Sequence, residues 1–181
     1  MAHPPISSQS PVRQRSSKKN DGEVPLWERP EILAKYPVKA KKNPDGSYDY
    51  SDPNFENADL CVDAPPGYWE TRGYQIIISK HLPYLTSKDC LLKKIPSADE
   101  DLLFNFGTDA RSKDRVSGTQ VMVASSSKYG RFDGEGSDSQ CILYLETQVG
   151  RVAAQVMNED NSTHNYKYLC QKAKELFEEL I

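Results

Sequence analysis

The cysteine and histidine side chains are the groups in this sequence best suited to bond-making chemistry. The cysteines are Cys61, Cys90, Cys141 and Cys170, and the histidines are His3, His81 and His164. A cysteine beside a histidine can act as a nucleophile with its base, but only His81 with Cys90 or Cys141 offers such a pair. No CxxC or HExxH spacing indicates a metal site. We therefore expect no catalysis, no cofactor and four reduced cysteines buried as small apolar groups.

A second group of residues points to binding rather than catalysis. The segment Pro65-Pro66-Gly67-Tyr68 matches PPxY, a motif that WW domains bind. Adjacent prolines favour an extended left-handed helix that fills an aromatic groove, and the tyrosine enters a second pocket. On this interpretation Pro65, Pro66 and Tyr68 bind a WW-domain protein. The alternative is that the match is fortuitous and that Tyr68 simply begins the core.

Charge divides the chain into a basic N-terminal part and an acidic remainder. Residues 1–42 hold nine Lys/Arg and four Asp/Glu, a net charge of +5, whereas residues 43–181 hold 14 and 22, a net charge of −8. A basic segment can bind a neighbouring copy of the acidic body, RNA or an anionic membrane surface. The alternative is a charged tail that only keeps itself solvated. The candidate residues for anionic-surface binding are Arg13, Arg15, Lys18 and Lys19.

Two N-terminal segments precede the part of the chain with regular periodicity. Residues 1–25 are polar and rich in Ser and Pro, so we expect a disordered basic arm. Residues 26–67 are expected to form a short helix, from Pro30 to Pro37, and a linker that ends in the PPxY element. So short a helix is marginal alone, and we expect it to dock on its own body or on another subunit. The candidate self-association residues on it are Trp27, Ile32, Leu33 and Tyr36.

Residues 68–181 are predicted to form a globular α+β domain, an antiparallel sheet with a C-terminal amphipathic helix packed on one face. Branched side chains indicate a strand over 73–80, and apolar residues at three- and four-residue steps indicate the final helix over 166–180. The other expected elements are strands at 120–124, 141–147 and 151–157, a short helix at 86–95, a segment at 102–107 that fits helix or strand, and a mobile loop at 128–139.

This layout resembles that of rhabdovirus matrix proteins, particularly the short ones of plant-infecting members. The resembling features are the chain size, the basic Ser- and Pro-rich arm, the PPxY element (Pro65, Pro66 and Tyr68), the linker and the α+β body. The resemblance implies a non-enzymatic assembly protein that self-associates, condenses the nucleocapsid and contacts an anionic membrane face. The alternative function is an RNA-binding or WW-domain-recruiting adaptor or accessory protein.

The expected location follows from what the sequence lacks. No apolar run approaches the roughly 20 residues that a membrane-spanning helix needs. The N-terminus lacks the charged and apolar regions of a secretory signal. We therefore expect a protein that is not secreted, has no transmembrane segment and lies peripheral to a membrane. The resemblance places it in the virion and the host cytoplasm.

Overall fold

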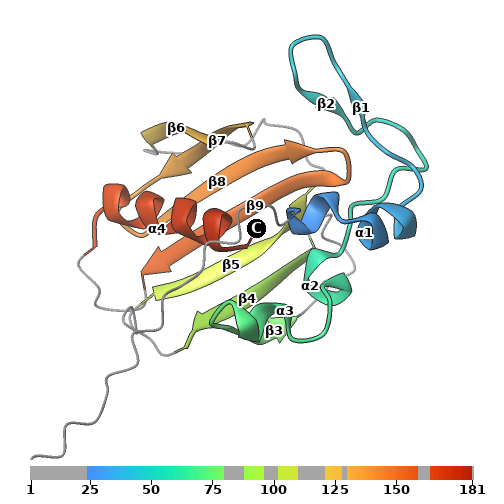
Figure 1. Cartoon of the computed structure of the whole chain (residues 1–181). Helices are drawn as coiled ribbons and strands as arrows, with labels where there is room; N and C mark the ends of the chain where they lie inside the picture. The colour runs from blue at the N-terminus through green and yellow to red at the C-terminus, as the bar shows by residue number, and fades with distance from the viewer. Residues whose placement is uncertain are drawn as a thin grey trace, which may run out of the picture.

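The computed structural model describes residues 24–79, 88–95, 102–109, 121–127, 130–158 and 164–180 (Figure 1). Its helices are the 3-10 helix η1 (Leu26–Glu28), α1 (Pro30–Lys35), α2 (Leu60–Asp63), α3 (Tyr68–Thr71) and α4 (Tyr166–Glu179). Its strands are β1 (Lys41–Lys42), β2 (Tyr48–Asp49), β3 (Tyr74–Ser79), β4 (Lys88–Lys94), β5 (Leu102–Asp109), β6 (Val121–Ser127), β7 (Gly130–Gly136), β8 (Gln140–Thr147) and β9 (Gly150–Asn158).

Seven of these strands form one antiparallel sheet in the order β3-β4-β5-β9-β8-β7-β6. It consists of two meanders, β3 to β5 and β6 to β9, which join where β5 pairs with β9 over eight residue pairs. Side chains along β8 alternate between buried and half-buried, the pattern of a sheet with a core on one face. The predicted α+β fold with an antiparallel sheet is confirmed.

The final helix covers the half of the sheet formed by β7, β8 and β9 (Figure 1). The side chain of Asn165 caps its first turn by accepting a hydrogen bond from the Tyr168 backbone N–H, 3.1 Å away. Its apolar stripe points into the core, as its three- and four-residue spacing predicts. The buried members of that stripe are Leu169, Ala173, Leu176 and Phe177.

The N-terminal segment covers the other half of the same face. Trp27 of η1 packs edge-on against Phe177 of α4, with ring centroids 6.1 Å apart, and Trp69 of α3 packs against Phe106 of β5. The backbone N–H groups of Ala40 and Ala58 donate to carbonyls in the β8–β9 turn. Residues 26–67 therefore share one core with the body, and the predicted domain boundary at residue 68 does not coincide with a break in packing.

The prediction of a helix at 86–95 is wrong for the described residues, because residues 88–94 form strand β4. Cys90 and Leu92 point into the core and alternate with the half-buried Asp89 and Leu91 and the exposed Lys93. β4 pairs on one side with β3 and on the other with β5, so the tertiary ladder overrides the local helix signals. The ambiguous segment at 102–107 is likewise a strand.

The glycine-rich segment expected to be a loop at 128–139 contains strand β7 over residues 130–136. Phe132 stacks on Phe177 with centroids 4.7 Å apart, which buries this strand under α4. A Cβ on Gly136 would lie 3.1 Å from Sγ of Cys170, so glycine lets the helix approach closely. The loop prediction is therefore wrong for these residues.

Other predictions from the sequence agree with the described structure. The strand over 73–80 appears as β3, the strand at 120–124 as β6, the strands at 141–147 and 151–157 as the antiparallel pair β8 and β9, and the N-terminal helix as α1. The Asn43-Pro44-Asp45-Gly46 turn closes the β1–β2 hairpin, with Gly46 at a φ of 88°. The predicted disordered basic arm lies almost wholly outside the described residues, which begin at Val24.

Candidate functional site

The PPxY element forms a tight turn rather than an extended ligand. The Tyr68 backbone N–H donates to the Pro65 carbonyl at 3.0 Å, and Gly67 adopts φ 74° and ψ 4°. These are the features of a type II turn, in which glycine supplies the positive φ. Tyr68 is 4% exposed, and its hydroxyl donates to the Leu180 carbonyl. Binding of this motif to a WW domain would therefore require Tyr68 to leave the core.

The candidate self-association residues lie against the chain's own body. Trp27 and Ile32 are 1% exposed, Tyr36 is 6% exposed, and Leu33 packs against the same core while partly buried. Of the two docking modes left open by the sequence, the described conformation has the helix on its own body. Association through these residues would require them to be exchanged between copies, so they do not form a free surface.

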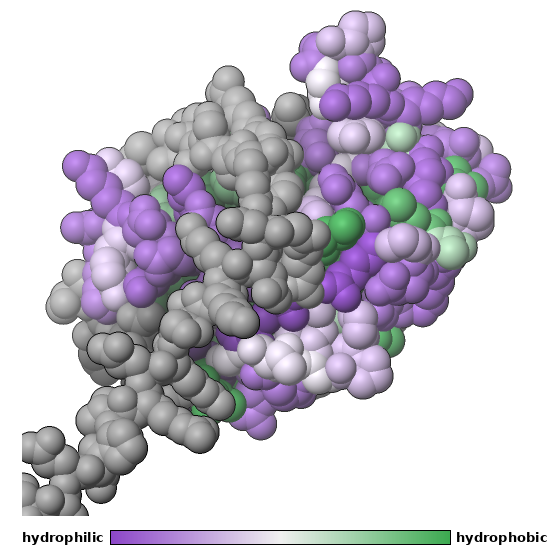
Figure 2. Space-filling model, in the orientation of Figure 1, coloured by the Kyte–Doolittle hydropathy of each residue, from purple (hydrophilic) through white to green (hydrophobic). Residues whose placement is uncertain are grey.

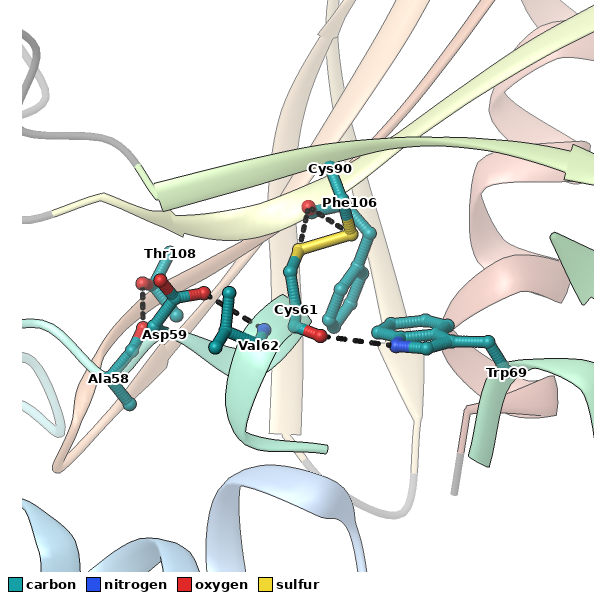
Figure 3. The surroundings of a disulfide bond; sticks show 8 residues. All are labelled: Ala58, Asp59, Cys61, Val62, Trp69, Cys90, Phe106 and Thr108. Atoms are coloured by element: carbon teal, nitrogen blue, oxygen red, sulfur yellow. Dashed lines mark hydrogen bonds between the residues drawn. A yellow bond between two sulfur atoms is a disulfide. The ribbon is translucent and has the colours of Figure 1, made fainter. Parts of the chain in front are cut away.

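All four cysteines form disulfides, and the expectation of four reduced cysteines is wrong. Cys61 of α2 bonds to Cys90 of β4, and Cys141 of β8 bonds to Cys170 of α4, each across 29 residues of sequence. Each bond links the sheet to a helix that covers it. The sulfur atoms of Cys61 and Cys90 also contact the carbonyl oxygen of Phe106 at 3.3 and 3.6 Å (Figure 3). The disulfides leave no thiolate to serve as a nucleophile.

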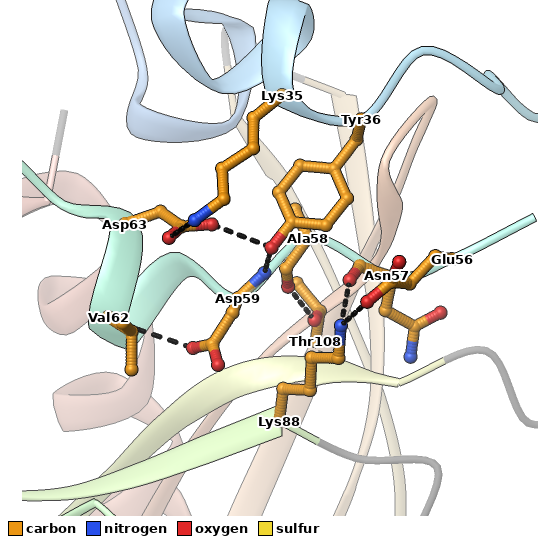
Figure 4. A network of polar contacts seen from close by, with 10 residues as sticks. All are labelled: Lys35, Tyr36, Glu56, Asn57, Ala58, Asp59, Val62, Asp63, Lys88 and Thr108. Carbon is orange, nitrogen blue, oxygen red and sulfur yellow. Dashed lines mark hydrogen bonds and ion pairs between the residues drawn. The ribbon is translucent and has the colours of Figure 1, made fainter.

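A polar network holds α1 against α2 beside the first disulfide (Figure 4). The Tyr36 hydroxyl donates to Oδ2 of Asp63 at 2.6 Å and accepts a hydrogen bond from the Asp59 backbone N–H at 2.7 Å. Burial, reinforced by the hydrogen bond to Asp63, raises the pKa of Tyr36 far above its ordinary value. Lys35 also pairs with Asp63. Because these groups satisfy one another, the network is best explained as a structural clamp.

The polar network also includes side chains of the sheet. Nζ of Lys88, at the start of β4, donates to the Asn57 carbonyl at 2.7 Å and pairs with Glu56 at 2.6 Å. The Thr108 hydroxyl of β5 donates to the Ala58 carbonyl. The backbone of residues 57–59 is thus held from the sheet and from α1 at once (Figure 4). The segment predicted to be a linker is fixed to the body here.

The face of the sheet opposite α4 is the strongest candidate for an interaction surface. Within the described ranges no helix packs on this face, which we call the open face. Cross-strand pairing and alternation with the buried side chains define its members. Its described side chains are Gln75, Asp89, Leu91, Lys93, Leu103, Asn105, Asp133, Glu135, Gln140, Ile142, Tyr144, Glu146, Arg151, Ala153, Gln155 and Met157.

Amide groups form a ladder across the centre of the open face. Nδ2 of Asn105 donates to Oε1 of Gln155 at 3.3 Å, and Nε2 of Gln155 donates to Oε1 of Gln140 at 2.6 Å. Leu91 lies directly across from Asn105, and Ile142 directly across from Gln155. This mixture of amide and apolar side chains suits contact with another polypeptide.

Carboxylates outnumber cations among the described side chains of the open face. The carboxylates are those of Asp89, Asp133, Glu135 and Glu146, whereas the cations are Lys93 and Arg151. The Arg151 guanidinium lies 4.5 Å from the centroid of the Tyr144 ring. This cation–π contact helps to fix the Arg151 side chain on the sheet. Glu146 already accepts a hydrogen bond from the Tyr48 backbone N–H at 2.8 Å, so the excess of carboxylates over cations on the described part of this face depends on Asp89, Asp133 and Glu135. An excess of this sign favours a basic partner.

Sequence patterns do not reveal the open face, because they predict a helix at 86–95 and a loop at 128–139 where the structure has strands β4 and β7. Both segments contribute strands whose outward residues complete this surface. An alternation of side chains along β4 was the available signal, since Cys90 and Leu92 alternate with Asp89, Leu91 and Lys93. Thr86 and Asp89 resemble a capping box, a helix signal that competes with this alternation.

Of the remaining candidate residues, the described structure includes only His164. Arg13, Arg15, Lys18 and Lys19 lie outside the described residues, as do His3 and His81. His164 stacks on Tyr168 at the start of α4, with ring centroids 4.2 Å apart. Among the described residues no group of three or more His, Cys, Asp or Glu side chains could hold a metal ion.

The described helices are all too short or too polar to cross a membrane. Comparison with family models, curated proteins and solved structures found no match to this chain. The fold and the geometry of the open face therefore carry the functional argument without a relative.

Proposed function

We propose that this chain is a non-enzymatic assembly protein that associates with copies of itself. The open face is the observation that carries the proposal, because a half-buried sheet surface with apolar, amide and acidic side chains suits protein contact. The resemblance to rhabdovirus matrix proteins supports the same role. In this role the protein works in a virion and in the host cytoplasm, peripheral to a membrane.

The basic arm is the partner that we propose for the open face. Residues 1–25 hold four Lys/Arg and two Asp/Glu, a net charge of +2, whereas the described open face carries more carboxylates than cations. An arm that reaches a neighbouring copy makes a head-to-tail contact, and such contacts propagate into chains unless the rotation closes a ring. An arm engaged in this way brings copies together without any exchange of the buried helix α1.

The disulfides bear on where assembly takes place. Disulfides persist in oxidising surroundings and are rare in a reducing cytosol. In the proposed role, Cys61–Cys90 and Cys141–Cys170 form when the assembled particle leaves the reducing cytoplasm. Thiol labelling of protein extracted from cells and of protein from released particles checks this order, with free thiols expected only in the former.

Sedimentation velocity over a range of salt and protein concentrations tests the proposed assembly. The wild-type chain should form reversible polymers at low salt that shorten as salt screens the contact between the arm and the open face. A full-length variant with Arg13, Arg15, Lys18 and Lys19 all changed to Gln should lose this growth. A matched variant neutralising Lys41, Lys42, Lys167 and Lys174 should retain it.

Two outcomes would contradict the proposal. One is growth in the arm variant equal to that of the wild type, which would remove the arm from assembly. The other is a wild-type monomer at every salt concentration. If that monomer bound RNA with a steep salt dependence that the arm variant lost, the accessory RNA-binding function would replace the proposal.

A further inference from the structure

Strand β3 ends the sheet, and its exposed edge is the basis of a second contact between copies. β4 pairs with β3 on one side, and no described strand pairs with it on the other. An edge strand presents unpaired backbone N–H and C=O groups, which form a template for another strand. A ligand for this edge is therefore a β-strand, because only a strand can satisfy a row of backbone groups.

The composition of β3 departs from the usual protection of a sheet edge. Natural edge strands are commonly shielded by Lys, by Pro, by an inward-pointing charge or by a β-bulge, and of these β3 has only the bulge. Residues Tyr74–Ser79 read Tyr-Gln-Ile-Ile-Ile-Ser and contain neither a charge nor a proline. A bulge interrupts the pairing with β4 between Ile76 and Ile78, and it accompanies an Ile77 side chain that is 47% exposed.

Exposed apolar side chains concentrate at this end of the sheet. The described residues include four large hydrophobic side chains that are exposed, and two of them belong to the β3–β4 pair: Ile77 on β3 and Ile95 just after β4, which is 50% exposed. The backbone N–H of Ile95 donates to the Gly73 carbonyl at 2.7 Å, so Ile95 stays against the start of β3. In the view of Figure 2, hydrophilic residues dominate the coloured surface and hydrophobic ones form small separate patches.

We propose that β3 pairs in an antiparallel manner with β3 of a second copy, about a two-fold axis. Such an interface places the same surface on both sides, so a charge on β3 would face its own copy. The uncharged sequence of β3 avoids this repulsion, and Ile77 contributes apolar area that the contact removes from water. This argument selects a second copy as the occupant of the edge.

This inference deepens the proposed self-association and rests on it. The arm contact is head-to-tail and extends in one direction, whereas the β3 contact is two-fold and closes after two copies. Together they cross-link chains of copies into a layer, the form that an assembly protein lining a surface requires. The two contacts also differ physically, since salt screens the first and leaves backbone pairing and apolar burial in place.

Sedimentation velocity at high salt tests the β3 contact with the arm contact screened. The full-length wild type should then remain a dimer, and Ile77→Lys should raise the dimer dissociation constant at least about tenfold, because the contact loses the apolar area of Ile77 and must desolvate a lysine instead, and salt screens neither effect. Val62→Lys is the matched control, since Val62 is 60% exposed on α2 and lies outside β3. Far-UV circular dichroism and cooperative unfolding establish that both variants fold.

The outcomes separate this inference from the proposed function. A wild-type monomer at high salt that polymerises at low salt overturns the β3 contact and leaves the arm contact standing. A high-salt dimer that does not grow at low salt overturns the arm contact and leaves the β3 contact standing. A dimer unchanged by Ile77→Lys overturns the β3 contact. If the dimer is lost when the arm is neutralised, the arm and not a second β3 binds the exposed edge. Hydrogen exchange gives a second readout, because the β3 amides should become protected as protein concentration rises.

Discussion

The Tyr68 hydroxyl donates a hydrogen bond to the backbone carbonyl of Leu180, which joins the PPxY turn to the C-terminal end of α4. This bond links positions 112 residues apart in the sequence. The Arg72 guanidinium lies over the Tyr68 ring, 3.9 Å from its centroid, and encloses it further. Tyr68 therefore stabilises the packing of the N-terminal segment on the helix.

Replacement of Tyr68 by Phe should destabilise the protein by about 1–2 kcal/mol, because the Leu180 carbonyl would be left buried without its donor. Urea unfolding followed by circular dichroism measures the change. Tyr166→Phe is the matched control, since its ring packs beside Gly136 and its hydroxyl makes no hydrogen bond among the described residues. Equal midpoints for the two variants would show that the Tyr68 hydroxyl contributes nothing.

Each disulfide should contribute about 3–4 kcal/mol to the free energy of unfolding, because a closed loop of this length restricts the unfolded chain. The double variant Cys61→Ser and Cys90→Ser, and the matching double variant of Cys141 and Cys170, test the two bonds separately by urea unfolding. Mass spectrometry after alkylation without reduction should find no labelled cysteine in wild-type protein from released particles. Labelling of all four in the native protein would contradict the pairing.

The stability of the protein should fall as pH rises above about 10, the ordinary pKa of a tyrosine. Burial raises the pKa of Tyr36 in the folded protein, as it does for Tyr50. Above the unfolded pKa the unfolded chain loses the Tyr36 proton while the folded chain retains it. The folded state then binds more protons, so the contribution that is fully present below pH 10 is lost with rising pH.

Tyr36→Phe provides the test of this pH dependence. Each retained proton steepens the loss of stability by at most about 1.4 kcal/mol per pH unit. Urea unfolding is measured between pH 9 and 11.5 in steps of about half a pH unit. The free energy of unfolding should decline less steeply with pH for Tyr36→Phe than for the wild type. Parallel declines would mean that Tyr36 ionises equally in the folded and unfolded chains.

Local periodicity predicted the elements whose signal lies within a few residues. The apolar stripe of α4 and the alternation in β8 each repeat at the period of the element, so both were predicted from the sequence. The strand β4 was missed, because Thr86 and Asp89 resemble a capping box and the strand depends on its neighbours β3 and β5. A pairing of cysteines such as Cys61 with Cys90 leaves no local pattern, since it reflects how distant segments meet.

The candidate site was less predictable than the fold. The PPxY letters are compatible with both an extended ligand and a turn, and Gly67 at positive φ produces the turn. Trp27 and Tyr36 are buried because the N-terminal segment fits the part of the sheet face that α4 leaves uncovered. That match is a property of the assembled sheet rather than of any short segment.

The glycines of β7 give a final prediction, because their role is steric rather than conformational. A Cβ on Gly134 would lie 2.2 Å from the Ile142 carbonyl oxygen and 2.7 Å from Cδ2 of Leu143. The carbonyl belongs to the paired strand β8, so it cannot move without disturbing the β7–β8 ladder. Gly134→Ala should therefore cost about 3 kcal/mol by overpacking.

Gly67→Ala is the informative comparison for Gly134→Ala. Gly67 has a positive φ of 74° and nothing within 4 Å of the position that a Cβ would occupy, so its substitution introduces backbone strain without a clash. That strain costs about 1 kcal/mol. Urea midpoints should rank wild type above Gly67→Ala and Gly67→Ala above Gly134→Ala. A reversed order would mean that β7 adapts to the methyl group and that its glycines are not required for close packing with β8.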